Sequence, residues 1–376
     1  MVEIDTILLK VASRCNINCR YCYVYNMGDN SWVDMPNFIS QSTIKAISTQ
    51  LIELQTKQKR SFAIVLHGGE PLLLGVRRLE FLLNSLRSAI PDTNYCISIQ
   101  TNGMLISDDI LNICSKYKVS ISVSLDGYEA IHNANRIGHH GEETFLQVLK
   151  GIEKLKSHPD NIFLFAGLLA VIDPTSNPYD IYKFFKSINT PNLDFLYRDG
   201  NHDNLPFGKS SFDSTEYGEW LVALLEIYLA DQKPLKIRIL DDIIRISLGG
   251  MGIKEGIGIT DFGIAVIDTD GSITKNDTLK SNYNGADRFS ESWNIHTHRL
   301  VDIFSSKEFA VAHELQRPTS SVCQNCSELS VCGGGMPLHR WKTGTDYANP
   351  SVYCNDQLYL IRKVKHILSG FKNEIA

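Results

Sequence analysis

Residues 6–22 read Thr-Ile-Leu-Leu-Lys-Val-Ala-Ser-Arg-Cys-Asn-Ile-Asn-Cys-Arg-Tyr-Cys, an apolar run that leads directly into three closely spaced cysteines. Thr6–Ala12 is typical of a buried β-strand, because it is short and mostly apolar. Cys15, Cys19 and Cys22 then follow on one loop. Three thiolates on a short loop can hold three irons of a cubic iron–sulfur cluster, which leaves the fourth iron without a protein ligand. Such an open position is a place for a substrate or cofactor to bind, as on a catalytic metal.

The first two hundred residues alternate short apolar segments with amphipathic ones. Further strands are expected at Phe62–His67, Tyr95–Thr101, Val119–Leu125, Ile162–Ile172 and Leu193–Tyr197. Helices are expected between them at Gln41–Gln55, Val76–Ser88, Asp108–Lys116, Glu143–Lys156 and Pro178–Lys186. This alternation predicts βαβ units and a parallel sheet. We therefore predict an α/β fold with a partial (β/α)6 TIM-like barrel, whose chemistry lies at the carboxyl ends of the strands.

The pattern changes after Tyr197. Helices are expected at Thr215–Asp231 and Leu240–Leu248, and a β-hairpin at Gly263–Thr274 with its turn at Asp270-Gly271. An irregular stretch with four cysteines follows, and a helix at about Asp356–Ser369 closes the chain. We predict a barrel over 1–200, a helical bridging region over 201–260 and a cysteine-bearing domain over 261–376.

The composition is that of an ordinary globular protein. The chain has 376 residues, of which 43% are hydrophobic and 21% charged, with a formal net charge of −5. This excludes a disordered chain and does not match a nucleic-acid binder, whose footprint would be basic. No apolar run reaches the ~18 residues that span a bilayer, and residues 1–10 do not read as a signal peptide. We expect a cytoplasmic protein with no nucleic-acid or membrane partner.

Seven of the nine cysteines form two groups, which in a reducing compartment more often indicates metal binding than disulfides. The second group is Cys323, Cys326 and Cys332, followed by Cys354. Four cysteines can close one iron–sulfur cluster, but they can also make a four-thiolate zinc site. The lone C-x3-C-x2-C spacing of the first group fits zinc poorly, since structural zinc sites favour paired C-x2-C arms. A zinc-binding scaffold without turnover is the non-enzyme alternative.

Motifs at the ends of the later strands make the chain similar to the radical S-adenosylmethionine (radical SAM) family. His67-Gly68-Gly69-Glu70-Pro71 ends the second predicted strand, as the GGE motif of that family does. The resemblance implies that this backbone binds the amino group of S-adenosylmethionine (SAM), that Arg136 pairs with its carboxylate and that Leu196 packs near the adenine. The cofactor-binding residues that it implies are Gly68, Gly69, Glu70, Gln100, Asn102, Ser124, Asp126, Arg136 and Leu196.

The tail resembles the SPASM extension of radical SAM enzymes that modify peptides. It departs from the full pattern, because the hairpin Asp268–Asn276 has no cysteine and Met336 stands four residues after Cys332. We therefore expect one auxiliary 4Fe–4S cluster on Cys323, Cys326, Cys332 and Cys354, besides the SAM-binding cluster on Cys15, Cys19 and Cys22. The resemblance also implies a reducing electron donor such as flavodoxin or ferredoxin.

Segments around 195–206, 277–280 and 332–354 resemble maturases that build cyclophanes in ribosomally made precursor peptides. The predicted function is thus a radical SAM oxidoreductase that joins an aromatic ring to a side-chain Cβ. Asp277 aligns with the acidic base of the related sulfatase-maturing enzymes, and an exposed turn carboxylate is the alternative. Formylglycine formation, thioether bonding and epimerisation remain other outcomes, although the loss of the first auxiliary cluster counts against the sulfatase type.

Several residues are left without a role. Cys96, in a strand, and Cys114, on an apolar helix face, are expected to be buried structural thiols, and a thiol hydrogen donor, as in some peptide-epimerising relatives, is the alternative. Asp199, His202 and Asp203 either line the substrate mouth or are solvated loop residues, and His139-His140 is expected to be a loop. No separate leader-recognition domain is expected, so a leader peptide would bind the surface of this chain or use a partner protein.

Overall fold

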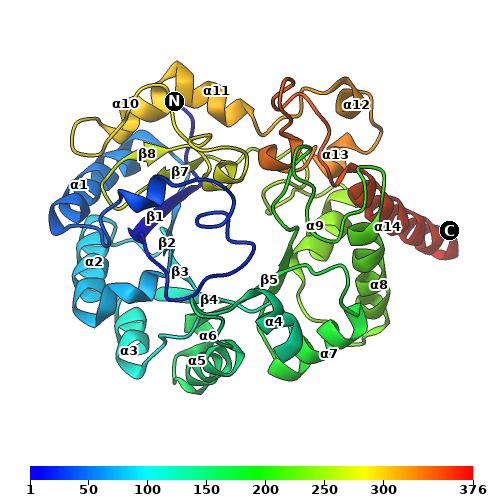
Figure 1. Cartoon of the computed structure of the whole chain (residues 1–376), viewed down its shortest axis with the longest axis horizontal. Helices are drawn as coiled ribbons and strands as arrows, with labels where there is room; N and C mark the ends of the chain where they lie inside the picture. The colour runs from blue at the N-terminus through cyan, green and yellow to red at the C-terminus, as the bar shows by residue number, and fades with distance from the viewer. Residues whose placement is uncertain (376) are drawn as a thin grey trace. The chain divides into compact units, whose positions relative to one another are not determined.

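The computed structural model describes residues 1–375, and it divides the chain into two compact units. The first unit comprises residues 1–125, 132–168 and 262–314. The second comprises residues 126–131, 169–261 and 315–376. Figure 1 shows the course of the chain by residue number. No helix among the described residues is both long enough and apolar enough to cross a bilayer. The boundaries predicted at residues 201 and 261 stay a prediction.

A mostly parallel sheet forms the core of the first unit. Its strands are β1 (Thr6–Ala12), β2 (Ala63–Gly68), β3 (Ile97–Thr101), β4 (Val119–Ser124), the first part of β5 (Phe165–Val171), β7 (Ile264–Ile267) and β8 (Ile273–Thr274). The order is β5-β4-β3-β2-β1-β7-β8, in which the pairs from β4 to β7 are parallel and β7 and β8 pair antiparallel. β5 runs on into the second unit, where β6 (Leu193–Leu196) follows it in the same order. Eight strands in a mostly parallel arrangement confirm the α/β class.

β1 is an interior strand of the sheet, because both of its edges are paired. Thr6 lies opposite Ala63 of β2 on one side and opposite Ile264 of β7 on the other. A buried strand of this kind is expected to be apolar throughout, and Ile7 and Leu9 are fully buried. The register to β2 shifts between Lys10 and Ala12. The pairing of β7 with β1 was not predicted, because the sequence of a hairpin carries no local signal that identifies its neighbouring strand.

Helices follow the strands as the alternation predicts. In the first unit they are α1 (Gln41–Lys57), α2 (Gly75–Ala89), α3 (Asp108–Lys116), α5 (Phe145–Ser157), α6 (Asn161–Leu164), α10 (Leu300–Ser305) and α11 (Lys307–Glu314), with 3-10 turns η1 (Ser31–Val33), η2 (Pro71–Leu74) and η3 (Asp277–Ser281). α4 (Glu129–Asn135) spans the boundary of the two units. Ser40 caps α1 and Ser107 caps α3, each accepting a backbone N–H. α1, α2 and α3 lie outside β1–β3 in Figure 1.

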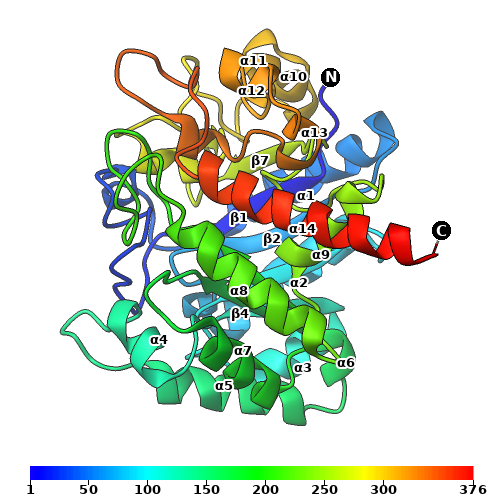
Figure 2. The same ribbon diagram turned by 90° about the vertical axis from the view of Figure 1, so that its right-hand side faces the viewer.

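The second unit is mainly helical. It contains α7 (Pro178–Ile188), α8 (Glu216–Ala230), α9 (Arg238–Ser247), α12 (Ser321–Gln324), α13 (Leu329–Cys332), η4 (Pro337–Arg340) and α14 (Cys354–Ile375). α8 and α14 run side by side in Figure 2. Gly218 of α8 allows this approach, because a Cβ there would lie 2.7 Å from the Asp356 carbonyl oxygen. Asp356 is fully buried and pairs with Lys209 at 2.7 Å.

Two local predictions were wrong. Cys96 lies before β3 and is exposed, because β3 begins only at Ile97, so this thiol is not a buried structural one. The strand expected from Ile162 begins at Phe165, since residues 161–164 form the short helix α6. Cys114 is buried on α3, as expected.

Candidate functional site

The loop that carries Cys15, Cys19 and Cys22 follows β1 and is held by backbone hydrogen bonds. Asn18 N donates to the Ile137 carbonyl at 2.7 Å, and Arg20 N donates to the Asn135 carbonyl at 2.9 Å. Cys22 N donates to the Cys19 carbonyl at 3.0 Å, which closes a turn between two of the cysteines. The loop therefore has a defined conformation with its three thiols on one short segment.

Two side chains fix the start of this loop. Exposed His139 donates from Nε2 to the Cys15 carbonyl at 2.9 Å. Asn102 donates from Nδ2 to Asn16 Oδ1 at 2.8 Å. The sequence analysis placed Asn102 at the cofactor site but expected His139 to be only a loop residue, and it did not single out Asn16. Asn16 has a sequence signal in its place on the cysteine loop, whereas His139 lies after α4 and has no local signal.

Cys19 is buried, Cys15 and Cys22 are partly buried, and the three thiols lie within electrostatic range of one another. Burial raises the pKa of Cys15 to about 12 and that of Cys22 to about 11, and the charge of Cys19 adds to both shifts. Thiols in such a place keep their protons unless a cation replaces them, and metal binding releases those protons. The three side chains thus fit a metal centre that supplies positive charge.

Gly68 and Gly69 are required by close packing against this loop. Gly68 has φ +130°, and a Cβ there would lie 2.1 Å from the Ala12 carbonyl oxygen. A Cβ on Gly69 would lie 2.2 Å from both the Arg14 carbonyl oxygen and the Tyr25 hydroxyl. Any larger residue would push the cysteine loop away from β2, so the two glycines bring strand end and loop together.

Glu70 organises the neighbouring strand ends through both carboxylate oxygens. Oε1 accepts from Thr101 Oγ1 at 2.6 Å and from Leu72 N at 2.9 Å, while Oε2 accepts from Asn102 N at 2.8 Å. Burial raises the pKa of Glu70, although these hydrogen bonds oppose the shift. Its side chain thus ties the end of β2 to the end of β3.

The other predicted cofactor residues fall into two places. In the first unit, Arg136 is buried, donates from Nη1 to Tyr21 Oη at 2.9 Å and lies within electrostatic range of Cys22. Gln100 donates to Ser124 Oγ at 2.9 Å. The second unit holds the remaining two: Asp126 accepts from Val171 N at 3.2 Å, and the Leu196 carbonyl accepts from Ile172 N at 2.9 Å.

Asp277 is a buried, paired carboxylate and not an exposed turn residue. It is 2% exposed and begins η3, and its Oδ1 lies 2.6 Å from Lys10 Nζ. Burial opposes its ionisation, but Lys10 and Lys280 outweigh burial, so its pKa lies below the ordinary value. Asp277 Oδ2 has no hydrogen-bond partner among the described residues.

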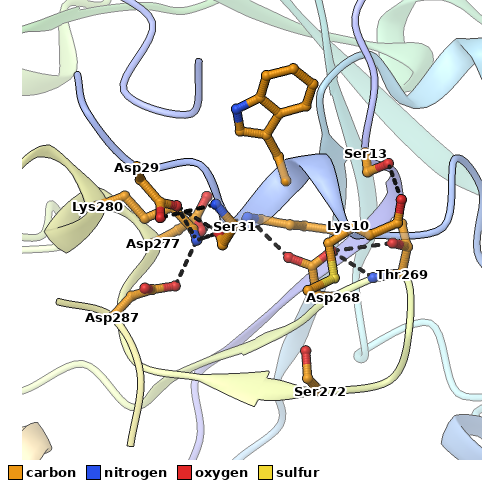
Figure 3. Close-up of polar contacts among 12 residues, drawn as sticks. Lys10, Ser13, Asp29, Ser31, Asp268, Thr269, Ser272, Asp277, Lys280 and Asp287 are labelled. Atoms are coloured by element: carbon orange, nitrogen blue, oxygen red, sulfur yellow. Dashed lines mark hydrogen bonds and ion pairs between the residues drawn. The ribbon is translucent and has the colours of Figure 1, made fainter. Parts of the chain in front are cut away.

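Figure 3 shows the charged cluster around this pair, which joins β1, η3 and the loops beside them. Lys280 Nζ donates to Asp29 Oδ2 at 2.8 Å and to Ser31 Oγ at 2.6 Å, and lies 2.9 Å from Asp287 Oδ2. Lys10 Nζ also lies 3.4 Å from Asp268 Oδ2. Lys10 was not predicted as a site residue, and its signal is a single charge within a mostly apolar interior strand.

The tail cysteines gather at helix ends within the second unit. Cys332 ends α13 and Cys354 begins α14, while Cys323 lies in α12 and Cys326 just after it. Burial raises the pKa of Cys332 to about 12 and that of Cys354 to about 11, and the charges of other tail cysteines add to both shifts. A helix N-terminus favours an anion, so Cys354 is well placed to become a thiolate ligand.

Arg340 is a buried cation beside these thiols, and the sequence analysis did not single it out. It is 1% exposed and donates from Nη2 to the Leu315 carbonyl, while its Nε has no partner among the described residues. Burial lowers its pKa to about 10, against the charges of Cys323 and Cys332. A permanent cation fits a site that would hold a net negative centre.

No three His, Cys, Asp or Glu side chains in the described part of the chain converge closely enough for one metal ion.

The residues after β6 hold a loop in place. His202 Nε2 donates to the Pro350 carbonyl at 2.8 Å, and Asp203 Oδ2 accepts from Thr343 N at 2.9 Å. Asp199 has no such role, and burial raises its pKa to about 7. His202 and Asp203 therefore anchor residues 341–350, a role that the sequence analysis did not consider for them.

Residues 9–170 match the family model of the radical SAM superfamily. The chain is 24% identical to a cysteine-type anaerobic sulfatase-maturating enzyme of Clostridium novyi, over 94% of this chain and 93% of the relative. It is 25% identical to a serine-type anaerobic sulfatase-maturating enzyme of Bacteroides thetaiotaomicron, over 89% of this chain and 83% of the relative.

Two solved structures share the fold. Native anSMEcpe with bound AdoMet superimposes with a TM-score of 0.82 at 22% identity, over 98% of this chain and 99% of that chain. SuiB of Streptococcus suis bound to its precursor peptide SuiA superimposes with a TM-score of 0.64 at 15% identity, over 94% of this chain and 76% of that chain. These superpositions show that the fold is shared over most of the chain, and not only over residues 9–170.

Proposed function

We propose that this chain is a radical SAM enzyme that forms a carbon–carbon crosslink between an aromatic ring and a side-chain Cβ of a ribosomally made precursor peptide. The observation that carries the radical chemistry is the three-thiol loop packed against Gly68 and Gly69, with Glu70 and Asn102 at adjoining strand ends. A peptide substrate is supported by relatives that mature sulfatases and by a structural neighbour that binds a precursor peptide.

The residues that would hold the cofactors fall into two sets. Cys15, Cys19 and Cys22 would bind one 4Fe–4S cluster, and the four tail cysteines would bind a second, auxiliary one. SAM would lie beside the first cluster, with Gly68, Gly69 and Arg136 among its contacts. When bound, these groups would supply a carbon radical that removes one hydrogen atom from the substrate, and they would accept the one electron that the radical adduct loses.

The chain itself must remove one proton. When a Cβ radical has added to an aromatic carbon, that carbon still carries its hydrogen, and aromaticity returns only when one proton and one electron leave. Asp277 is our candidate base, since its carboxylate is ionised and its Oδ2 has no described partner. Positioned bases typically contribute about 10²–10⁴-fold.

A second candidate is formylglycine formation on a protein, which the two sulfatase-maturating relatives favour. Against it stands the absence of a cysteine from residues 268–276 and Met336 at the position four after Cys332, since the full SPASM pattern draws first-cluster ligands from both places. Asp277 would serve as base in either reaction, so the carboxylate does not distinguish them.

The test is anaerobic reconstitution with iron and sulfide, followed by incubation with SAM, a strong reductant and any short peptide that a neighbouring reading frame encodes. We expect 5′-deoxyadenosine and a peptide that has lost two hydrogens. In mass spectrometry, the backbone within one short crosslinked ring of this peptide should not yield fragments. A serine oxidised to formylglycine loses the same mass but reacts with a hydrazide, and its backbone fragments normally. Absence of 5′-deoxyadenosine under strong reductant would remove the radical SAM proposal itself.

The base assignment is tested separately with Asp277→Asn. We expect 5′-deoxyadenosine formation within about threefold of the unmodified chain, while crosslinked peptide falls by about 10²-fold or more. The ratio of the two products, followed by chromatography and mass spectrometry, isolates the proton-removal step. Crosslinking at the original rate would make Asp277 a structural residue.

A further inference from the structure

Lys10 is a charged residue in a place where a charge is costly. It lies in the interior strand β1, is 4% exposed, and has fully buried Leu9 and Val11 as chain neighbours. Burying an ammonium group is unfavourable unless partners compensate for the lost water. The register of β1 to β2 shifts between Lys10 and Ala12, and irregularities of this kind often redirect side chains beside active sites.

The contacts of Lys10 connect it to two carboxylates and to the glycines that pack against the cysteine loop. Its Nζ lies 2.6 Å from Asp277 Oδ1 and 3.4 Å from Asp268 Oδ2. The same side chain lines a small cavity of about 10 Å³ together with Gly68 and Gly69. Lys10 therefore joins the strand end beside the cysteine loop to the carboxylate that we propose as base.

We infer that Lys10 is the positioning residue of Asp277: its ammonium group holds one carboxylate oxygen and leaves the other for the departing proton. This inference rests on the proposed function. In the step concerned, the ring C–H bond of the radical adduct breaks, its proton moves to Asp277 Oδ2, and one electron goes to an oxidised iron–sulfur cluster. Lys10 neither gains nor loses a proton in this step.

Lys280 is not an equivalent partner, although it lies in the same cluster. Its three N–H groups are directed to Asp29, Ser31 and Asp287, at 2.6 to 2.9 Å. No hydrogen bond between Lys280 and Asp277 is present among the described residues, so Lys280 acts on that carboxylate only at longer range. Removal of Lys10 thus leaves Asp277 without a contacting cation.

The expected pH dependence follows from the groups that face Asp277. These are Lys10 of β1, His67 of β2, Lys280 of η3, and the carboxylates Asp268 and Asp287. Without Lys10, burial dominates and the two neighbouring carboxylates add to it, so the pKa of Asp277 rises above its ordinary value. A protonated carboxyl group cannot accept the proton, and crosslinking should recover as the pH is raised.

The experiment compares Lys10→Met with Lys10→Arg in the reconstituted enzyme, using the ratio of crosslinked peptide to 5′-deoxyadenosine across pH. We expect Lys10→Met to lower this ratio at least about tenfold near neutral pH, in line with loss of a positioned base, and to recover as the pH rises. Lys10→Arg should stay within about threefold at all pH values, because it keeps the charge. Lys275→Met, a neighbouring half-buried lysine outside the cluster, is the matched control.

Each outcome decides a different question. A Lys10→Met ratio equal to that of the unmodified chain, with a flat pH profile, overturns the inference and leaves the proposed function intact. Absence of crosslinked peptide from the unmodified chain overturns the proposed function instead. Where circular dichroism shows that Lys10→Met does not fold, Lys10→Gln replaces it, since the amide is polar but carries no charge to hold the carboxylate. An unchanged Lys10→Gln ratio would likewise overturn the inference.

Discussion

The loop Cys15–Cys22 and the tail segment Cys323–Cys354 both gather cysteines, but they do so with different surroundings. The loop offers three thiols and is packed against two glycines, whose missing side chains leave backbone groups close by. The tail offers four thiols at helix ends, with the buried Arg340 beside them. Three ligands suit a centre that must bind something else, and four suit a centre that is coordinatively closed.

The residues around the two cysteine groups also differ in their polarity. Beside the loop, Asn102 and Glu70 present polar groups at strand ends. Beside the tail, Tyr353 is fully buried and its ring centroid lies 4.4 Å from that of Tyr197. A polar site can recognise a cofactor that comes and goes, whereas an aromatic shell excludes water around a permanent one. The comparison therefore predicts separable functions for the two groups.

The largest effect is expected from replacing Cys15, Cys19 and Cys22 together by Ala. Iron should fall from about eight to about four per chain, because one cubic cluster of two is lost. Formation of 5′-deoxyadenosine should fall by more than about 10³-fold. A loss of this size is only a small part of the total rate acceleration that enzymes typically provide. Metal analysis and chromatography measure both. Exposed Cys96→Ala is the control, and full iron content in the triple variant would contradict the assignment.

The next effect separates the tail from the loop. Replacing Cys332 and Cys354 by Ala should again leave about four irons per chain, but 5′-deoxyadenosine formation should stay within about threefold. Crosslinked peptide should fall at least about tenfold, because the final electron has lost its acceptor; product ratios of this kind isolate the affected step. Equal losses of both products would instead make the tail a purely structural element.

A smaller effect is expected at Arg340. A unit charge a few ångströms from a partly buried group is worth about 1–4 kcal/mol, or on the order of 40–170 mV for a one-electron couple. Arg340→Met should lower the midpoint potential of the tail centre by this order, because a cation favours the more negative reduced form. Redox titration followed by electron paramagnetic resonance measures it, and Arg340→Lys should retain most of the potential. An unchanged potential in Arg340→Met would make the arginine a packing residue.

The strands, helices and cysteine groups could be predicted because their signals are local. Apolar periodicity placed β1 at Thr6–Ala12 and α3 at Asp108–Lys116 without error. Lys10, His139 and Arg340 could not be assigned roles in this way, because each acts on a residue more than fifteen positions away in the sequence. Strand propensity even argues against a lysine at position 10, and only its buried partner explains it.

The smallest effect is expected at the hydrogen bond between His139 and the Cys15 carbonyl, which is 2.9 Å long and lies at the exposed rim of the loop. A single such bond contributes about 0.5–1 kcal/mol, so His139→Ala should weaken SAM binding by about two- to fivefold. The physical reason is that a less constrained loop must be ordered when the cofactor binds. Spectroscopic titration of the reconstituted loop centre with SAM measures this, and exposed His140→Ala is the control. Because the tail centre lies on other segments of the chain, its potential should not change in either variant. A change there would show that the two cysteine groups are coupled, and would break the division on which their separate roles depend.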